Sequence, residues 1–96
     1  MVIKRILKLG ASWCQPCHVF SKTFNKVAEM EEYKGIEFKE IDIEEDEDGE
    51  LLVEKFGIRN VPTTLILDEN DELIYKLSGN LPLNDFTEVI NDALNK

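Results

Sequence analysis

Apolar residues follow two spacings along this chain, and each spacing predicts one kind of element. Stretches rich in Val, Ile, Leu and Thr are typical of strands, which we expect over residues 2–9, 36–43, 63–68 and 73–78. Apolar residues that recur every three or four positions indicate helices, which we expect over residues 15–33, 49–56 and 82–95. Gly35 and Gly57 follow the first two helices, as glycine does at many helix ends.

The order of these elements predicts an α/β fold. A long helix joins the first two strands, so we expect them to pair in parallel through a right-handed crossover. The short turn "ENDE" joins the last two strands, which therefore form an antiparallel hairpin. The expected architecture is a minimal β-α-β-α-β-β-α core, with a four-stranded mixed sheet flanked by helices. Residues 1–96 are expected to form a single domain.

The net charge of the chain argues against one class of binding partner. The chain has 20 acidic and 11 basic residues and a formal net charge of −9. Nucleic-acid binding needs clustered Lys and Arg, so we do not expect it here. The acidic run over residues 44–50 is interpreted as a solvated turn and helix start. A small, strongly charged chain of this kind is expected to be a monomer.

The N-terminal stretch does not resemble a targeting signal. "MVIKRILKL" is apolar but is interrupted by Lys4, Arg5 and Lys8, whereas a signal peptide has an uncharged core. No stretch approaches the roughly 20 apolar residues that span a membrane. We therefore expect a cytoplasmic protein without a membrane partner. Two cysteines in a reducing compartment are more often catalytic or metal-binding than structural.

Both cysteines lie in "GASWCQPCHVF", residues 10–20, which allows three chemistries. Cys-Gln-Pro-Cys has the spacing of a redox dithiol, and with His18 it also matches a c-type haem attachment pattern. The two cysteines and His18 could instead ligate zinc, with a carboxylate as the fourth ligand. The position between a strand and a helix favours the dithiol. We accordingly expect neither a metal nor a cofactor.

Cys14 comes immediately before the first predicted helix. The helix N-terminus favours an anion, so a thiolate is stabilised there. We expect Cys14 to be the exposed attacking cysteine and Cys17, one turn further on, to be the resolving cysteine. Pro16 suits the first turn, where its missing N–H costs little.

Three segments resemble the thioredoxin family: "WCQPC", "FGIRNVPTTLIL" and "KLSGNL". They occur in the family's order and spacing and span most of residues 8–95. The resemblance implies a thiol-disulfide oxidoreductase that reduces protein disulfides through Cys14 and Cys17. It also implies thioredoxin reductase or glutathione as the electron donor.

The resemblance further implies where a substrate binds. The Val61–Pro62 peptide bond is expected to be cis, with Pro62 beside Cys14 and the backbone of Val61 paired with an extended substrate. Trp13 is expected to flank the dithiol as an apolar contact surface. Gly79, in the loop before the last helix, is expected to complete the substrate-binding set.

The chain departs from the family at Lys8, where thioredoxins bury an acidic residue beneath the dithiol. The family's lysine partner falls on Glu40, so the two charges have exchanged places. Strand alternation supports inward-facing positions for both, although each side chain could also reach the surface independently. A charged Lys8 would attract the Cys17 thiolate, whereas a neutral Lys8 could accept the thiol proton.

Two other functions stay open at this point. The minimal core also resembles glutaredoxins, which would couple the dithiol to glutathione. The fit is partial, because the Ser78-Gly79-Asn80-Leu81 turn lacks the acidic residue of that family. Thioredoxin folds also serve as protein-binding modules, in which the dithiol is not needed.

Overall fold

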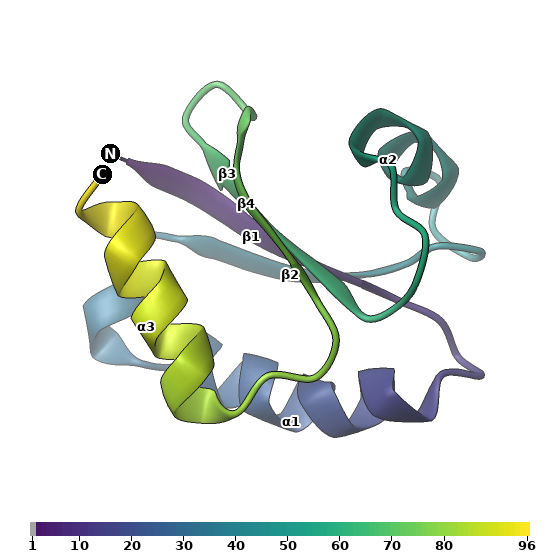
Figure 1. Ribbon diagram of the computed structural model, residues 1–96, viewed down its shortest axis with the longest axis horizontal. Helices are drawn as coiled ribbons and strands as arrows, with labels where there is room; N and C mark the ends of the chain where they lie inside the picture. Colours follow the sequence, from purple (N-terminus) through teal and green to yellow (C-terminus); the bar gives the residue numbers. More distant parts are fainter. Residues whose placement is uncertain (1) are drawn as a thin grey trace.

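The computed structural model describes residues 2–96 and contains one mixed sheet with helices on both faces (Figure 1). Met1, the first residue of the expected domain, lies outside the described residues. The strands are β1 (Ile3–Gly10), β2 (Glu37–Asp42), β3 (Thr63–Asp68) and β4 (Leu73–Ser78). The helices are α1 (Gln15–Ala28), the short 3-10 helix η1 (Glu31–Tyr33), α2 (Gly49–Phe56) and α3 (Leu83–Leu94).

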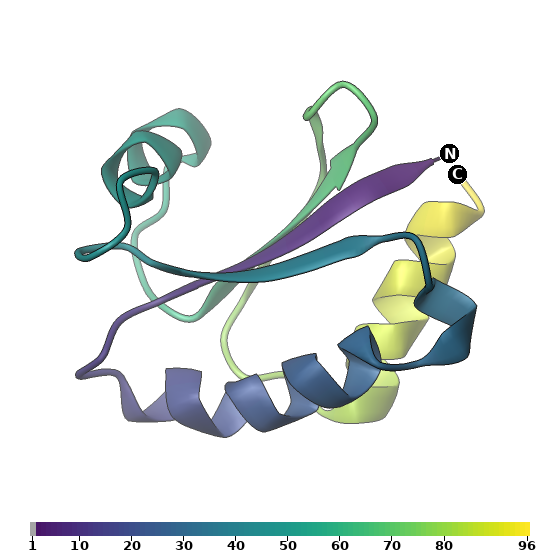
Figure 2. The same cartoon turned by 180° about the vertical axis from the view of Figure 1, so that it is seen from behind.

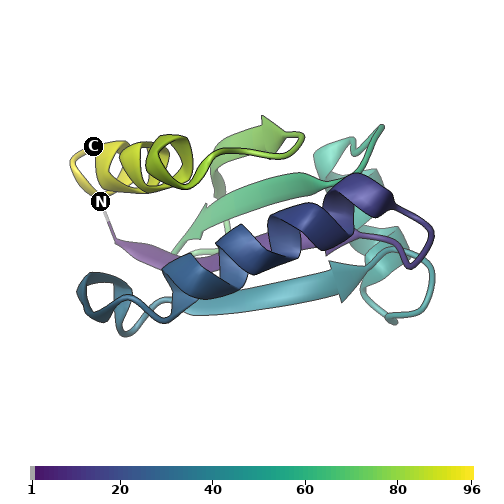
Figure 3. The ribbon, with the colours of Figure 1, turned by 90° about the horizontal axis from the view of Figure 1, so that it is seen from below.

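The sheet has the strand order β2-β1-β3-β4. β1 and β2 are parallel, and β3 and β4 form an antiparallel hairpin, so both predicted pairings are confirmed. β3 lies antiparallel to β1 in the centre of the sheet. Helices α1 and α3 cover one face and α2 covers the other, as the views from behind and from below also show (Figures 2 and 3).

The first predicted helix, over residues 15–33, is too long. α1 ends at Ala28, Met30 has an extended backbone, and a separate 3-10 turn then leads into β2. The break lets Tyr33 turn into the core, where it is fully buried and its hydroxyl donates to Asn91 of α3. The end of α1 is therefore coupled to a contact between residues 58 positions apart, which local spacing does not display.

Two apolar layers hold the helices on the sheet. Alternation along β1 places Ile6 under α1 and α3, and Leu7 and Leu9 under α2. The larger layer is built from Ile3, Ile6, Phe20, Phe24, Val27, Tyr33, Ile66, Phe86, Ile90 and Ala93. This packing fixes the N-terminus of α1 just beyond the end of β1. Among residues 2–96, no helix combines the length and apolar character needed to cross a membrane.

Candidate active site

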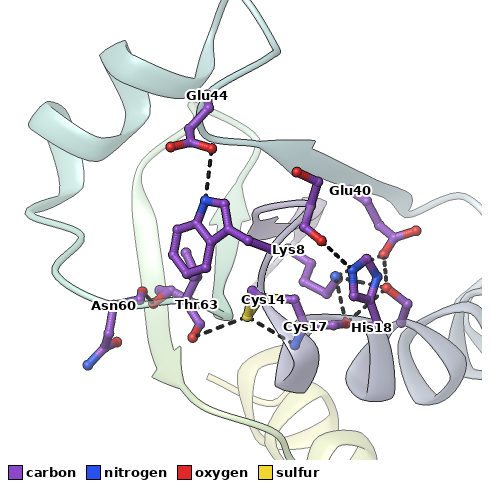
Figure 4. Close-up of a disulfide and its surroundings, with 12 residues drawn as sticks. Lys8, Cys14, Cys17, His18, Glu40, Glu44, Asn60 and Thr63 are labelled. Atoms are coloured by element: carbon purple, nitrogen blue, oxygen red, sulfur yellow. Dashed lines mark hydrogen bonds and ion pairs between the residues drawn. A yellow bond between two sulfur atoms is a disulfide. The ribbon is translucent and has the colours of Figure 1, made fainter.

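Cys14 and Cys17 form a disulfide at the junction of β1 and α1 (Figure 4). Their Cα atoms are 5.2 Å apart. Cys14 caps the N-terminus of α1, and its Sγ accepts a hydrogen bond from the backbone N–H of Cys17 at 3.1 Å. Pro16 occupies the first turn, as expected. The first turn of the helix therefore directs a free N–H group at the sulfur of Cys14 rather than at that of Cys17.

The expectation that Cys14 is exposed is wrong for this disulfide form. Cys14 is 4% exposed and Cys17 is 2% exposed. Ala11, Ile43 and Val61 pack around the pair, and the carbonyl oxygen of Val61 lies 3.7 Å from Cys14 Sγ. These covering residues come from three different parts of the chain, so the spacing of the cysteines alone did not reveal them.

The loop before β3 brings Val61 and Pro62 to the disulfide. The peptide bond between them is cis. The Thr63 hydroxyl donates to the Asn60 carbonyl oxygen at 2.7 Å, and the Gly79 N–H donates to the Pro62 carbonyl oxygen at 2.8 Å. Gly79 has a φ of +89°, a conformation that favours glycine. Two hydrogen bonds therefore fix the loop. One forms between Thr63 and Asn60, and the other comes from Gly79 at the end of β4.

Trp13 lies beside the disulfide with 66% of its surface exposed. Its indole Nε1 donates to Glu44 Oε1 at 2.9 Å, which orients the ring (Figure 4). The ring borders a groove of about 340 Å³. The other residues that line this groove are Ile43, Val53, Ile58, Arg59, Asn60 and Val61. Trp13 and Val61 therefore belong to one largely apolar surface next to the cysteines.

Lys8 is buried beneath the disulfide and is paired with Glu40. The two residues face each other across the parallel strands β1 and β2, with Nζ 3.0 Å from Oε1. Nζ also donates to the carbonyl oxygen of Cys17 at 3.2 Å and to the Ser21 hydroxyl at 2.9 Å. Of the two arrangements that the sequence left open, the structure has the paired one.

Glu40 remains 39% exposed at the edge of this cluster. Partial burial works to raise its pKa, but hydrogen bonds from Ser21 and Lys8 and the charge of Lys8 outweigh this and lower the pKa below the usual range. The Ser21 hydroxyl donates to Glu40 Oε1 at 2.5 Å. Sequence reasoning missed Ser21, although its position four residues after Cys17 places both on one helix face. It also missed Glu44, which no spacing distinguishes within the acidic run.

The geometry around His18 does not support the zinc interpretation. His18 is exposed, and its Nε2 lies 2.8 Å from the Ser12 carbonyl oxygen rather than beside the sulfurs. No group of three or more His, Cys, Asp or Glu residues within the described chain is placed to hold a metal ion.

The site has the features of a dithiol exchange centre: a cysteine pair at a helix N-terminus and a partly apolar surface beside it. The thioredoxin family model matches residues 3–92, and the chain belongs to the thioredoxin family. Family membership and the joined cysteines together make this protein a thiol-disulfide oxidoreductase.

Individual thioredoxins are similar over most of the chain. The thioredoxin Asp f 29 of Aspergillus fumigatus is 32% identical over 77 residues, which cover 80% of this chain and 67% of that protein. The chloroplastic F-type thioredoxin of Spinacia oleracea is 35% identical over 65 residues, 68% of this chain but only 32% of that protein. The match to the spinach protein therefore concerns one part of a longer chain.

Solved structures agree with the fold. The short form of thioredoxin f from spinach chloroplast has a TM-score of 0.76 at 30% identity, covering 96% of this chain and 78% of that one. Thioredoxin-2 of a malaria parasite has a TM-score of 0.79 at 25% identity, covering 96% and 85%. These matches support the expected mixed sheet with helices on both faces, and thus the thioredoxin fold.

Proposed function

We propose that this protein reduces disulfides in other proteins, with Cys14 as the attacking cysteine and Cys17 as the resolving cysteine. The observation that carries the assignment is the hydrogen bond from the Cys17 N–H to Cys14 Sγ at the N-terminus of α1. The same N–H and the helix dipole stabilise a thiolate on Cys14 once the disulfide is reduced. The thiolate is the nucleophile in disulfide exchange.

The reaction has two exchange steps. The Cys14 thiolate attacks one sulfur of the substrate disulfide, forms a mixed disulfide and releases the other substrate sulfur as a thiolate. The Cys17 thiolate then attacks Cys14 Sγ and releases the second substrate thiolate. The substrate gains two electrons and takes up two protons, and the Cys14–Cys17 disulfide remains on the enzyme.

An extended substrate segment would bind beside Trp13 and along the Val61–Pro62 loop. Trp13 offers an exposed aromatic face, and Val61 shares its groove. Gly79 supports this surface because its N–H holds the Pro62 carbonyl. In the disulfide form Cys14 is covered, so the substrate would meet it after reduction, when the bond to Cys17 has opened.

We further propose the setting in which the protein works. Residues 1–96 act as one monomeric domain that carries electrons in the cytoplasm, and thioredoxin reductase or glutathione restores its dithiol. The net charge of −9 opposes self-association and supports the monomer. Lys8, paired with Glu40, positions Cys17 by donating a hydrogen bond to its carbonyl oxygen.

Turnover with two electron-donor systems tests this function. Insulin reduction is measured with NADPH and thioredoxin reductase, and separately with NADPH, glutathione and glutathione reductase. We expect turnover with thioredoxin reductase. Turnover with glutathione alone would make the protein glutaredoxin-like. A Cys14→Ser/Cys17→Ser variant that keeps full biological activity would instead indicate a binding module.

A further inference from the structure

The buried amino group of Lys8 has three hydrogen-bond acceptors around it. They are the Cys17 carbonyl oxygen at 3.2 Å, the Ser21 hydroxyl at 2.9 Å and Glu40 Oε1 at 3.0 Å. An ammonium group has three N–H donors, whereas a neutral amine has only two. The three partners therefore match the charged form, and they fix the direction in which Nζ points (Figure 4).

Gly10 leaves an opening between this ammonium and the sulfur of Cys17. A Cβ atom on Gly10 would lie 3.2 Å from Cys17 Sγ and 3.5 Å from Lys8 Nζ. Both atoms are thus within 3.5 Å of one point, and no carboxylate oxygen is nearer to that point than Nζ. The two atoms are therefore less than about 7 Å apart, close to the range of about 4–6 Å over which an opposite charge stabilises a thiolate.

The opening belongs to a cleft of about 330 Å³ that Lys8, Gly10 and Cys17 line together. The charged or titratable groups that share the cleft are Glu40 and Asp42 from β2 and His18 from α1. From β3, the residue that faces Lys8 in register is the uncharged Thr64. Lys8 is therefore the one lysine or arginine among the residues that line this cleft.

We propose that the Lys8 ammonium stabilises the thiolate of Cys17 across the opening left by Gly10, and that Glu40 and Ser21 hold the ammonium in place. This rests on the proposed function, in which Cys17 resolves the mixed disulfide. The Cys17 thiol loses its proton to water in the cleft, and the thiolate forms a bond to Cys14 Sγ. The bond from Cys14 to the substrate breaks, and the departing substrate thiolate takes up a proton. Lys8 is unchanged throughout.

The test is a pH titration of the Cys17 thiolate, followed by its absorbance near 240 nm in a Cys14→Ala background. We expect the further change Lys8→Met to raise the Cys17 pKa by about one unit. Lys4→Met is the matched control: it removes the same charge from the same strand, but Lys4 is exposed and pairs with Asp71. We expect Lys4→Met to leave the Cys17 pKa unchanged.

Glu40→Gln separates charge from structure. Glutamine keeps an oxygen that can accept from Lys8, but it removes the negative charge that opposes a thiolate. The Cys17 pKa should therefore stay the same or fall in Glu40→Gln, while it rises in Lys8→Met. If the two substitutions only loosened the site, the Cys17 pKa would shift in the same direction in both variants. Should Lys8→Met not fold, Lys8→Gln replaces it with the same expected rise in the Cys17 pKa, and the charge-conserving Lys8→Arg is its control.

The proposal is overturned if Lys8→Met titrates like Lys4→Met, or if Glu40→Gln or Lys8→Arg raises the Cys17 pKa. This titration uses no substrate and no electron donor, so it does not depend on insulin turnover. If the wild-type protein reduces insulin but Lys8→Met leaves the Cys17 pKa unchanged, only the role of Lys8 is rejected. If Lys8→Met raises the Cys17 pKa but the wild-type protein does not reduce insulin, only the proposed function is rejected.

Discussion

Lys8 Nζ lies 3.0 Å from Glu40 Oε1, across facing positions of the parallel strands β1 and β2. The lysine is buried, the glutamate is partly exposed, and Ser21 bonds to both. A buried cation that loses its partner is costly, so removing the Glu40 carboxylate should destabilise the fold.

Glu40→Gln should therefore make stability less sensitive to acid. The pKa of Glu40 is lowered in the fold, so its contribution is present above its unfolded value of 4.5 and is lost as pH falls through the folded value. We expect the variant to be about 1 kcal/mol less stable at pH 7, a modest loss because the carboxylate is partly exposed. Urea unfolding at pH 7 and pH 3 measures this. An equal difference at the two pH values would contradict the assignment.

Trp13→Ala should lower kcat/KM for a protein disulfide by about tenfold, because an exposed aromatic contact is lost. The reaction with a small disulfide such as dithiobis(nitrobenzoate) should change far less. Leu51→Ala is the control, since Leu51 is also 66% exposed but lies on α2 and lines a different groove. Equal losses in the two variants, or equal losses with both substrates, would remove Trp13 from the substrate surface.

Gly79→Ala should impair turnover beyond its effect on stability. Both Gly79 and Gly35 have positive φ and open space around the missing side chain, so either alanine variant should cost about 1 kcal/mol of unfolding free energy. Alanine keeps the N–H that bonds the Pro62 carbonyl but disfavours a φ of +89°, and a shift of this backbone would move the N–H, so only Gly79→Ala should reduce kcat/KM for insulin. Thermal unfolding and insulin reduction are measured on both. If Gly35→Ala loses as much activity, the effect is one of stability.

Local patterns predicted the strands, the second and third helices and the dithiol junction. Strand content and alternation describe β1 well, since Ile6 and Lys8 share one face and Leu7 and Leu9 share the other. The sequence predicted that Cys14 lies at the N-terminus of a helix, and in the structure it is the N-cap of α1. These features depend on neighbours within one or two turns, which the sequence displays directly.

Several features that depend on distant residues were not predicted, whereas the cis bond between Val61 and Pro62 was expected from the family resemblance. α1 ends at Ala28, where the chain turns to bury Tyr33 against α3, and no glycine or proline marks that break. Cys14 is covered because Ile43 and Val61 arrive from other loops. The sequence favoured inward positions for Lys8 and Glu40 but left their pairing open, because only the register of β1 with β2 brings them together.

Trapping of a mixed disulfide distinguishes the proposed attacking cysteine, Cys14, from the proposed resolving cysteine, Cys17. Reduced Cys17→Ser and Cys14→Ser variants are each mixed with insulin, and the products are analysed by mass spectrometry without a reducing agent. We expect Cys17→Ser to accumulate a mixed disulfide on Cys14 and Cys14→Ser to form little adduct. An adduct that forms equally or preferentially on Cys17 would contradict the assignment of Cys14 as the attacking cysteine.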